Sequence, residues 1–91
     1  MRQMRDFLQQ IIRQVGLEGP LKDQRVIEMW PEVVGETIAA VSTADRVENG
    51  VLYVRVPAAV WRTELSLERE KILRALWERT SCRHIREIRF I

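Results

Sequence analysis

The sequence has few of the residues on which catalysis, metal binding and disulfide cross-linking depend. Among its 91 residues there is one cysteine, Cys82, and one histidine, His84. A lone cysteine cannot form a disulfide within the chain, and a Cys-x-His pair without further Cys or His cannot complete a zinc site. The pair also lacks the third, orienting group that nucleophilic catalysis needs, and no phosphate-binding or dinucleotide-binding glycine motif is present. We therefore expect no metal, no cofactor and no enzymatic activity.

Long apolar runs are also missing. No stretch approaches the roughly 20 apolar residues that cross a bilayer. The N-terminal residues up to Val15 are interrupted by arginine, aspartate and glutamine, so they lack the apolar centre of a signal peptide. A hydrophobic content of 46% with 31% charged residues is typical of a folded soluble domain. We expect one small domain in the cytoplasm, without membrane contact.

The charges that are present are unevenly distributed. The net charge is +2, but residues 58–91 carry eight basic and five acidic residues. Thirteen of the fifteen basic residues are arginine, whose planar fork suits phosphate groups and stacking on bases. This favours an acidic partner such as nucleic acid. An ordinary solvated helix surface, or a GC-rich genome, would produce the same pattern.

Three helices are predicted in the first 40 residues. Apolar residues at three- and four-residue steps predict a helix over Arg2–Val15, and Gly16 is suited to end it. A second helix is predicted over Leu21–Met29. Because the residue before a proline avoids helical backbone angles, we expect the chain to turn at Trp30 and a third helix to span Pro31–Ala40.

The clearest pattern predicts a β-hairpin. Asn49-Gly50 separates two apolar, β-branched segments and supplies the two positive φ angles of a type I′ turn. In the second strand, which Pro57 ends, Leu52, Val54 and Val56 share one face. A long helix is then predicted over Ala58–Thr80, followed by a strand over Ile85–Ile91. The sequence thus predicts an α+β fold in which a three-stranded sheet carries helices on one face.

The long helix carries two tryptophans in different positions. Trp61 belongs to the apolar stripe that continues through Leu65, Ile72 and Leu76, so we expect it to pack in the core with one ring edge near the surface. Trp77 lies about 120° from the centre of that stripe. It is predicted either to be covered by one of the first two helices or to dock on a base or a protein.

Several segments in order resemble one bacterial family. They read V-I-E-M-W-P-E-V-V-G-E-T-I-A, A-D-R-V-E-N-G-V-L-Y-V-R-V, V-W-R-T-E-L, I-L-R-A-L-W and I-R-E-I-R-F. Together they are similar to the DciA family over about residues 22–91, which leaves residues 1–21 as an N-terminal helix and turn. The resemblance implies a KH-like domain that binds single-stranded or structured DNA. It also implies a replicative DNA helicase of the DnaB type as partner, with the chain assisting helicase loading.

The expected site residues fall into two sets, of which the resemblance itself points to Trp61. The helicase contact is expected to involve Trp61, Glu64 and Trp77. The nucleic-acid contact is expected from arginines of the C-terminal half, namely Arg62, Arg69, Arg74, Arg86 and Arg89. Two other functions remain open at this point: a KH-like RNA-binding protein, and a homodimeric protein-interaction module without nucleic acid.

Overall fold

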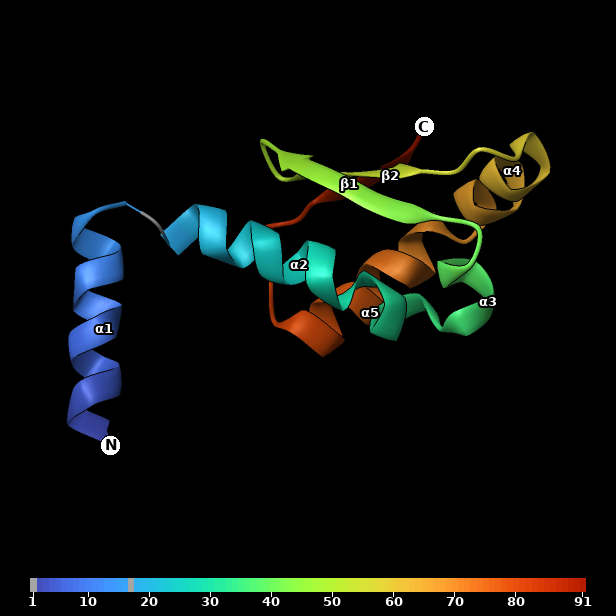
Figure 1. The fold of residues 1–91 in the computed structure, drawn as a ribbon. Helices are drawn as coiled ribbons and strands as arrows, with labels where there is room; N and C mark the ends of the chain where they lie inside the picture. The colour runs from blue at the N-terminus through green and yellow to red at the C-terminus, as the bar shows by residue number, and fades with distance from the viewer. Residues whose placement is uncertain (1, 17) are drawn as a thin grey trace.

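The part of the chain that the structure describes folds into five helices and one three-stranded sheet (Figure 1). The computed structural model describes residues 2–16 and 18–91. The elements, in chain order, are α1 (Arg2–Gln14), α2 (Glu18–Val34), α3 (Glu36–Ala39), β1 (Thr43–Glu48), β2 (Val51–Arg55), α4 (Ala59–Leu67), α5 (Arg69–Thr80) and β3 (Glu87–Phe90). The predicted α+β class is confirmed.

The sheet has the order β1-β2-β3, with β2 in the centre. Strands β1 and β2 pair antiparallel, whereas β2 and β3 pair parallel. The predicted hairpin turn is confirmed, because Asn49 has φ 51° and Gly50 has φ 78°. A side chain at Gly50 would also meet the carbonyl oxygen of His84 at 2.9 Å. Glycine is therefore required there both by the backbone angle and by the segment that passes over the turn.

The core lies between one face of the sheet and helices α2 and α5, which run below the sheet in Figure 1. Leu52, Val54 and Val56 are fully buried on that face, as their alternation predicts. Ile85 and Ile88, just before and within β3, are equally buried. The apolar stripe of the predicted long helix also faces inward: Leu65, Ile72 and Leu76 are buried and Trp61 is half-buried.

The expected turn at Trp30 is wrong. Helix α2 continues through Pro31 to Val34, and the break falls at Gly35, which has φ 86°. Trp30 is buried at the centre of the core, and its indole N–H donates to the Ser42 hydroxyl oxygen at 3.0 Å. Burial of this large ring outweighs the local preference of a pre-proline residue for extended angles. The predicted helices over Leu21–Met29 and Pro31–Ala40 are thus one long helix followed by the single turn α3.

The expected continuous helix over Ala58–Thr80 is also wrong. It is broken at Glu68, whose backbone (φ −99°, ψ 11°) separates α4 from α5. The Glu68 N–H donates to the Leu65 carbonyl at 3.1 Å, a tightened i to i−3 bond that ends α4. No glycine or proline lies in residues 59–80, so the sequence contains no local signal for the break.

The last strand is shorter than predicted. It covers Glu87–Phe90 in place of Ile85–Ile91, because residues 85 and 86 approach the hairpin turn before pairing with β2 begins. The Arg86 N–H donates to the Gly50 carbonyl at 2.8 Å. Ile88 points into the core and Phe90 is half-buried beside it.

Helix α1 projects from the rest of the molecule (Figure 1). Its apolar residues, which we call the α1 stripe, are Met4, Phe7, Leu8, Ile11, Ile12 and Val15; all are exposed except Ile12, which is half-buried. The Cα radius of gyration is 14.8 Å, whereas a compact chain of this length has about 12 Å. The longest principal extent, 49 Å, is about twice the next, 24 Å. We refer to residues 18–91 as the body.

Candidate nucleic-acid interface

The sheet face opposite the helices carries a row of three side chains, one from each strand. Arg46 pairs with Tyr53 across β1 and β2, and Tyr53 pairs with Arg89 across β2 and β3. The Arg46 guanidinium carbon lies 4.2 Å from the centre of the Tyr53 ring, and that of Arg89 lies 5.9 Å away. Both distances allow cation–π attraction, so the ring holds two guanidinium groups on an exposed surface.

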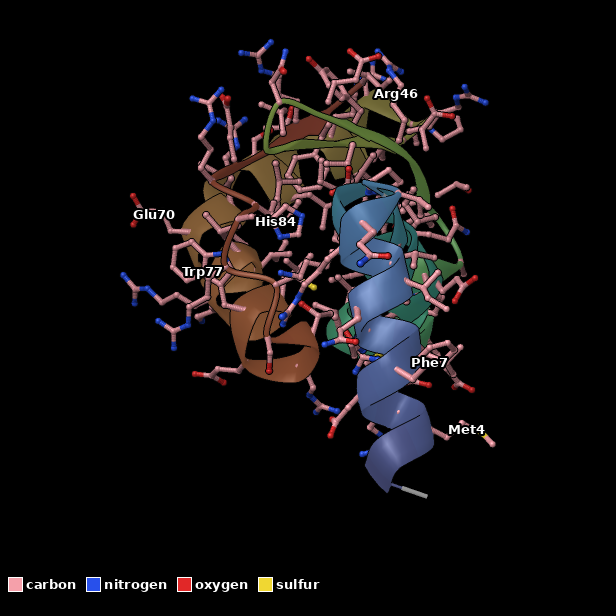
Figure 2. All side chains as sticks on the ribbon, turned by 90° about the vertical axis from the view of Figure 1, so that its left-hand side faces the viewer. Met4, Phe7, Arg46, Glu70, Trp77 and His84 are labelled. Carbon is pink, nitrogen blue, oxygen red and sulfur yellow. The ribbon has the colours of Figure 1, made fainter. Side chains whose placement is uncertain are left out.

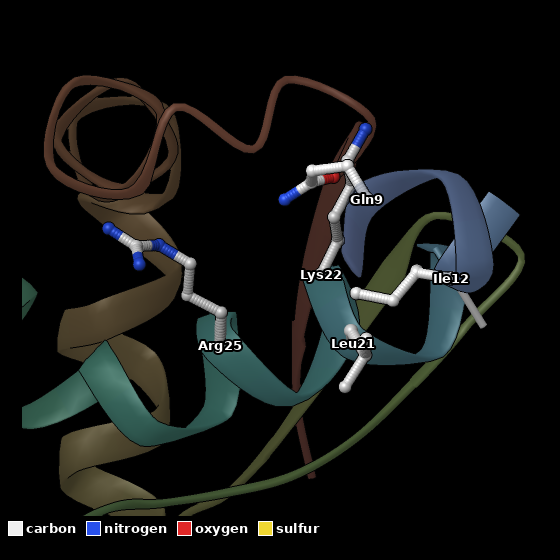
Figure 3. A pocket seen from close by; sticks show the side chains of 5 residues that line it. All are labelled: Gln9, Ile12, Leu21, Lys22 and Arg25. Atoms are coloured by element: carbon white, nitrogen blue, oxygen red, sulfur yellow. The ribbon is translucent and has the colours of Figure 1, made fainter. Parts of the chain in front are cut away.

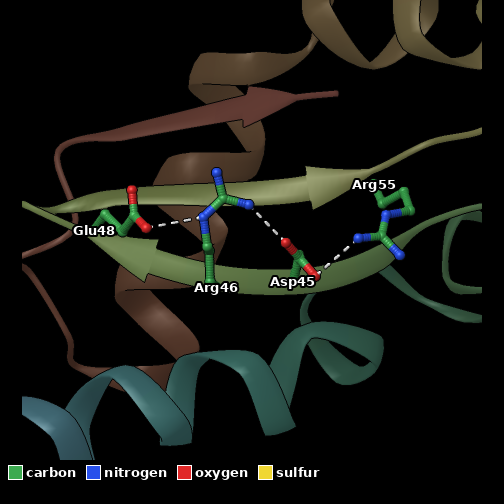
Figure 4. A network of polar contacts seen from close by, with 4 residues as sticks. All are labelled: Asp45, Arg46, Glu48 and Arg55. Carbon is green, nitrogen blue, oxygen red and sulfur yellow. Dashed lines mark hydrogen bonds and ion pairs between the residues drawn. The ribbon is translucent and has the colours of Figure 1, made fainter.

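Carboxylates contact the arginines of β1 and β2, Arg46 and Arg55 (Figure 4). Arg46 contacts Asp45 at 2.7 Å and Glu48 at 3.1 Å, and Arg55 contacts the other oxygen of Asp45 at 3.2 Å. The hydrogen bond that Arg46 donates to the Asp45 carboxylate raises the pKa of Arg46 above its ordinary value. Exposed ion pairs of this kind contribute little to stability, so a phosphate could replace a carboxylate at low cost.

The third strand repeats this arrangement with one pair. Arg89 contacts Glu87 at 3.4 Å, and this hydrogen bond raises the pKa of Arg89. Val51 of β2 pairs with Glu48 of β1 on one side and with Glu87 of β3 on the other. It is buried although it points to the outer face. The outer face is therefore a mixed surface, basic and aromatic in one row and acidic in the next.

A β-bulge arranges the polar network. The register between β1 and β2 shifts between Ala44 and Arg46, so Asp45 has no residue opposite it. A bulge of this kind re-aims side chains and increases the local twist. Here it places half-buried Asp45 between Arg46 and Arg55, where each of its oxygens accepts from one guanidinium.

The five predicted arginines lie on different parts of the surface. Arg89 belongs to the outer sheet face, and Arg86 lies beside it, donating from Nε to the Asn49 carbonyl at 3.1 Å. Arg62 on α4 donates to the carbonyls of Val56 at 2.6 Å and Pro57 at 3.3 Å, so it holds the connection from β2 to α4.

The other two predicted arginines lie on α5. Arg74 is exposed. Arg69 is half-buried, and its buried Nε has no hydrogen-bond partner among the described residues. The predicted set is therefore divided between the sheet and the helices.

The predicted partner-binding residues lie on the helical side. Trp61 is half-buried against the core, and Glu64 on the same helix is exposed. Trp77 is half-buried and donates its indole N–H to the Ile85 carbonyl at 2.7 Å. Trp77 is thus fixed by the segment that leads into β3. It lines an open hollow of about 320 Å³ with Glu70, Leu73 and Arg74; Figure 2 shows Glu70 and Trp77 on the same side of the molecule.

Three residues of the outer sheet face were not among the site residues predicted from the sequence: Arg46, Tyr53 and Arg55. The alternation of β2 places Tyr53 and Arg55 opposite Leu52, which is a detectable signal. Arg46 could not be assigned to this row, because the bulge at Asp45 changes the register of β1. The parallel pairing that brings Arg89 alongside is likewise absent from the local pattern.

Cys82 and His84, the two residues with possible metal or nucleophile chemistry, are separated by their surroundings. Cys82 is buried, whereas His84 Nε2 lies 2.7 Å from an Asp23 carboxylate oxygen at the surface (Figure 2 labels the histidine). Within residues 2–16 and 18–91, no group of three His, Cys, Asp or Glu side chains could hold a metal ion. In the same ranges, no helix is long and apolar enough to cross a membrane.

Fold and surface together define the class: a small α+β domain whose mixed sheet is covered by helices on one face and leaves a basic, aromatic and acidic face open. Comparison with known proteins gives the family. Residues 3–90 match the model of DciA, described as the "Dna[CI] antecedent", and the chain belongs to this family. It is also similar to a UPF0232 protein of Rhodococcus jostii strain RHA1, with 32% identity over 63 residues. That match covers 69% of the chain but only 34% of the relative, so the chain spans about a third of the relative's length.

Proposed function

We propose that this domain is a non-enzymatic accessory protein of DNA replication that binds the replicative helicase and DNA in the cytoplasm and supports helicase loading. The observation that carries the proposal is the family match, which extends over residues 3–90. The mixed outer face supports a binding role, because its arginines are charged, exposed and held in place by a ring and by carboxylates.

The outer sheet face is the DNA contact that we favour. Half-buried Tyr53, beside two guanidinium groups, offers a base a ring to stack on and a phosphate two charged forks. The surrounding carboxylates make the contact weak and selective, because DNA must displace them. Arg69 and Arg74 on α5 form the alternative contact. Arg62, which donates from Nη1 to the carbonyls of Val56 and Pro57, is not assigned to either contact.

A matched pair of double variants distinguishes the two DNA contacts. One carries Arg46→Gln and Arg89→Gln on the sheet, the other Arg69→Gln and Arg74→Gln on α5. Each removes two positive charges, so the change in net charge is the same. We expect the sheet pair to weaken binding of a single-stranded oligonucleotide. The slope of log affinity against log salt concentration should become shallower, as expected when about two phosphate contacts are lost. The α5 pair should keep the slope of the parent. The reverse result would move the contact to α5, and equal slopes in all three proteins would contradict both.

The helicase contact that we propose is centred on Trp61, with Glu64 and Trp77 contributing. Trp61 has a buried part that fixes it and an exposed part that a partner could cover. Trp61→Phe keeps most of the apolar area but removes the indole N–H and part of the ring width. We expect this variant to keep its melting temperature within a few degrees and to lose helicase affinity by roughly tenfold.

The measurement is a direct titration of the purified domain against the DnaB-type helicase of the same organism. Thr63→Ala, on an exposed position of the same helix, serves as the control and should bind like the parent. Unchanged binding by Trp61→Phe would show that Trp61 only packs the core. No binding by the parent would contradict the helicase proposal itself.

A further inference from the structure

The α1 stripe contains five of the nine large apolar side chains that are exposed among the described residues. Its exposed members have the following exposed fractions: Met4 67%, Phe7 62%, Leu8 52%, Ile11 39% and Val15 59%. Within the part of the chain that the structure describes, the other exposed large apolar side chains are Leu21 beside α1, and Val60, Leu67 and Ile91 in the C-terminal half. Soluble domains rarely leave a continuous stripe of this kind without a partner.

An isolated helix of this length also needs a partner to be stable. Helix α1 has 13 residues, and helices shorter than about 12–15 residues are marginal in water without tertiary packing. The body offers it little cover. Ile12 and Gln9 of α1 line a cleft of about 200 Å³ with Leu21, Lys22 and Arg25 of α2 (Figure 3). Of the body's other exposed apolar side chains, Val60 and Leu67 belong to α4, at the opposite end of the molecule from α1 (Figure 1).

The spacing of the stripe specifies what covers it. Met4, Leu8, Ile11 and Val15 follow the alternating three- and four-residue steps of the inner positions of a coiled coil, and Val15 keeps the helical hydrogen bond to the Ile11 carbonyl at 3.0 Å. Phe7 and Ile12 occupy the two positions that flank this seam. In a parallel pair these flanking positions contact each other across the two helices, Phe7 of one copy against Ile12 of the other. In an antiparallel pair they would instead meet Gln14 and Arg5.

The α1 polar residues also permit self-pairing. Among residues 2–16, Arg5 is the only charged residue at a flanking position, and the pair that forms across the seam, Phe7 with Ile12, is uncharged. A fully exposed side chain of this size has an area of about 150–200 Å². With the exposed fractions given above, the stripe exposes roughly 500 Å² in each copy. Two copies would then bury on the order of 1,000 Å², which is the lower limit of a specific interface.

From these observations we infer that α1 is a dimerisation helix: two copies of this chain pair their α1 stripes as a short parallel coiled coil. The two bodies then diverge from the same end of the pair, each with its sheet face free. This inference does not rest on helicase or DNA binding. The interface is small, so the dimer is expected to form reversibly at roughly micromolar concentration.

Sedimentation equilibrium over a range of concentrations tests the pairing. The variant is Leu8→Glu and its control is Gln10→Glu, which adds the same charge to the outer side of the same helix. We expect the parent and the control to show a monomer–dimer equilibrium, and Leu8→Glu to lose roughly tenfold or more in dimer affinity. All three tryptophans lie in the body, so their emission verifies that each variant is folded. A monomeric parent, or a Leu8→Glu variant that dimerises like the parent, would overturn the inference.

A disulfide tests the parallel direction. Met4→Cys places two thiols in the same layer of a parallel pair, where a disulfide can form. In an antiparallel pair the two positions are about 11 residues apart along the axis, roughly 16 Å, which is beyond disulfide reach. We expect air oxidation to cross-link Met4→Cys and to leave Gln10→Cys uncross-linked; Cys82 is buried and is common to both. Equal cross-linking of the two variants, or none, would overturn the parallel arrangement.

Discussion

Helices α1 and α5 are nearly equal in length, with 13 and 12 residues, but they differ in whether their apolar side chains are buried. Helix α5 buries Ile72, Leu76 and Thr80, whereas the α1 stripe is exposed apart from half-buried Ile12. Apolar spacing is at least as regular in α1 as in α5. The difference shows that periodicity predicts a helix and the face to be covered, but does not say what will cover it.

The largest contrast is expected between two leucine truncations. Leu76→Ala removes a fully buried side chain from the core and should lower the free energy of unfolding by about 2–5 kcal/mol. Leu8→Ala, in α1, should change it by less than about 0.5 kcal/mol at a concentration where the chain is monomeric. Denaturant titrations followed by tryptophan emission measure both. Equal losses would mean that α1 unfolds cooperatively with the body, and the comparison would fail.

Two glycines with similar backbone angles provide the next contrast. Gly50 has φ +78° and lies under the His84 carbonyl, whereas Gly16 has φ +74° and has open space around it. Gly50→Val should therefore destabilise the body by about 1–3 kcal/mol, because the new side chain is strained and also meets backbone. Gly16→Val should leave the melting temperature of the body unchanged, since the strain falls outside it. An unchanged melting temperature for Gly50→Val would contradict the turn.

A smaller effect is expected from an aromatic exchange. Trp77→Phe removes the hydrogen bond to the Ile85 carbonyl and should destabilise the body by about 1 kcal/mol. Phe7→Leu in α1 should leave thermal unfolding unchanged, because the Phe7 ring contacts solvent in the monomer. If Trp77→Phe unfolds at the parent temperature, the bond between the indole and the strand entry contributes nothing to the body.

The smallest effect is expected at the outer face. Arg46→Gln breaks two ion pairs, but both are exposed and screened by solvent, so the melting temperature should stay within error of the parent. Arg5→Gln in α1 should give the same result. Thermal scans at low and high salt measure both. A clear loss for Arg46→Gln alone would mean that the polar network stabilises the sheet and is not held ready for a ligand.

The sequence predicted those parts of the fold that depend on local chemistry. The Asn49-Gly50 turn follows from backbone angles, and the burial of Leu52, Val54 and Val56 follows from alternation. The continuation of α2 through Pro31 could not be predicted, because it depends on the burial of Trp30, which is a property of the assembled core. The break at Glu68 has no local signal either.

The same division applies to the candidate surfaces. Sequence reasoning selected arginines by their number in the C-terminal half, but only the fold shows that Arg62 binds backbone carbonyls and that Arg89 lies beside Tyr53. The row of Arg46, Tyr53 and Arg89 depends on a bulge and on a parallel pairing between residues far apart in the chain. Neither is encoded in any short stretch. Whether the predicted residues bind helicase or DNA stays a prediction.

The parallel pairing of β2 and β3 has a consequence for the order of folding during synthesis. The hairpin can close as soon as it is made, within microseconds, but β3 can pair only after α4 and α5 have been translated, at about 5–20 residues per second. Until then Leu52 and Val54 lack the cover of Ile85 and Ile88, and the backbone bonds that join Ile91 to Val54 and Val56 are unmade. The nascent chain therefore spends seconds with this face of β2 uncovered, until residues 85–91 have been synthesised.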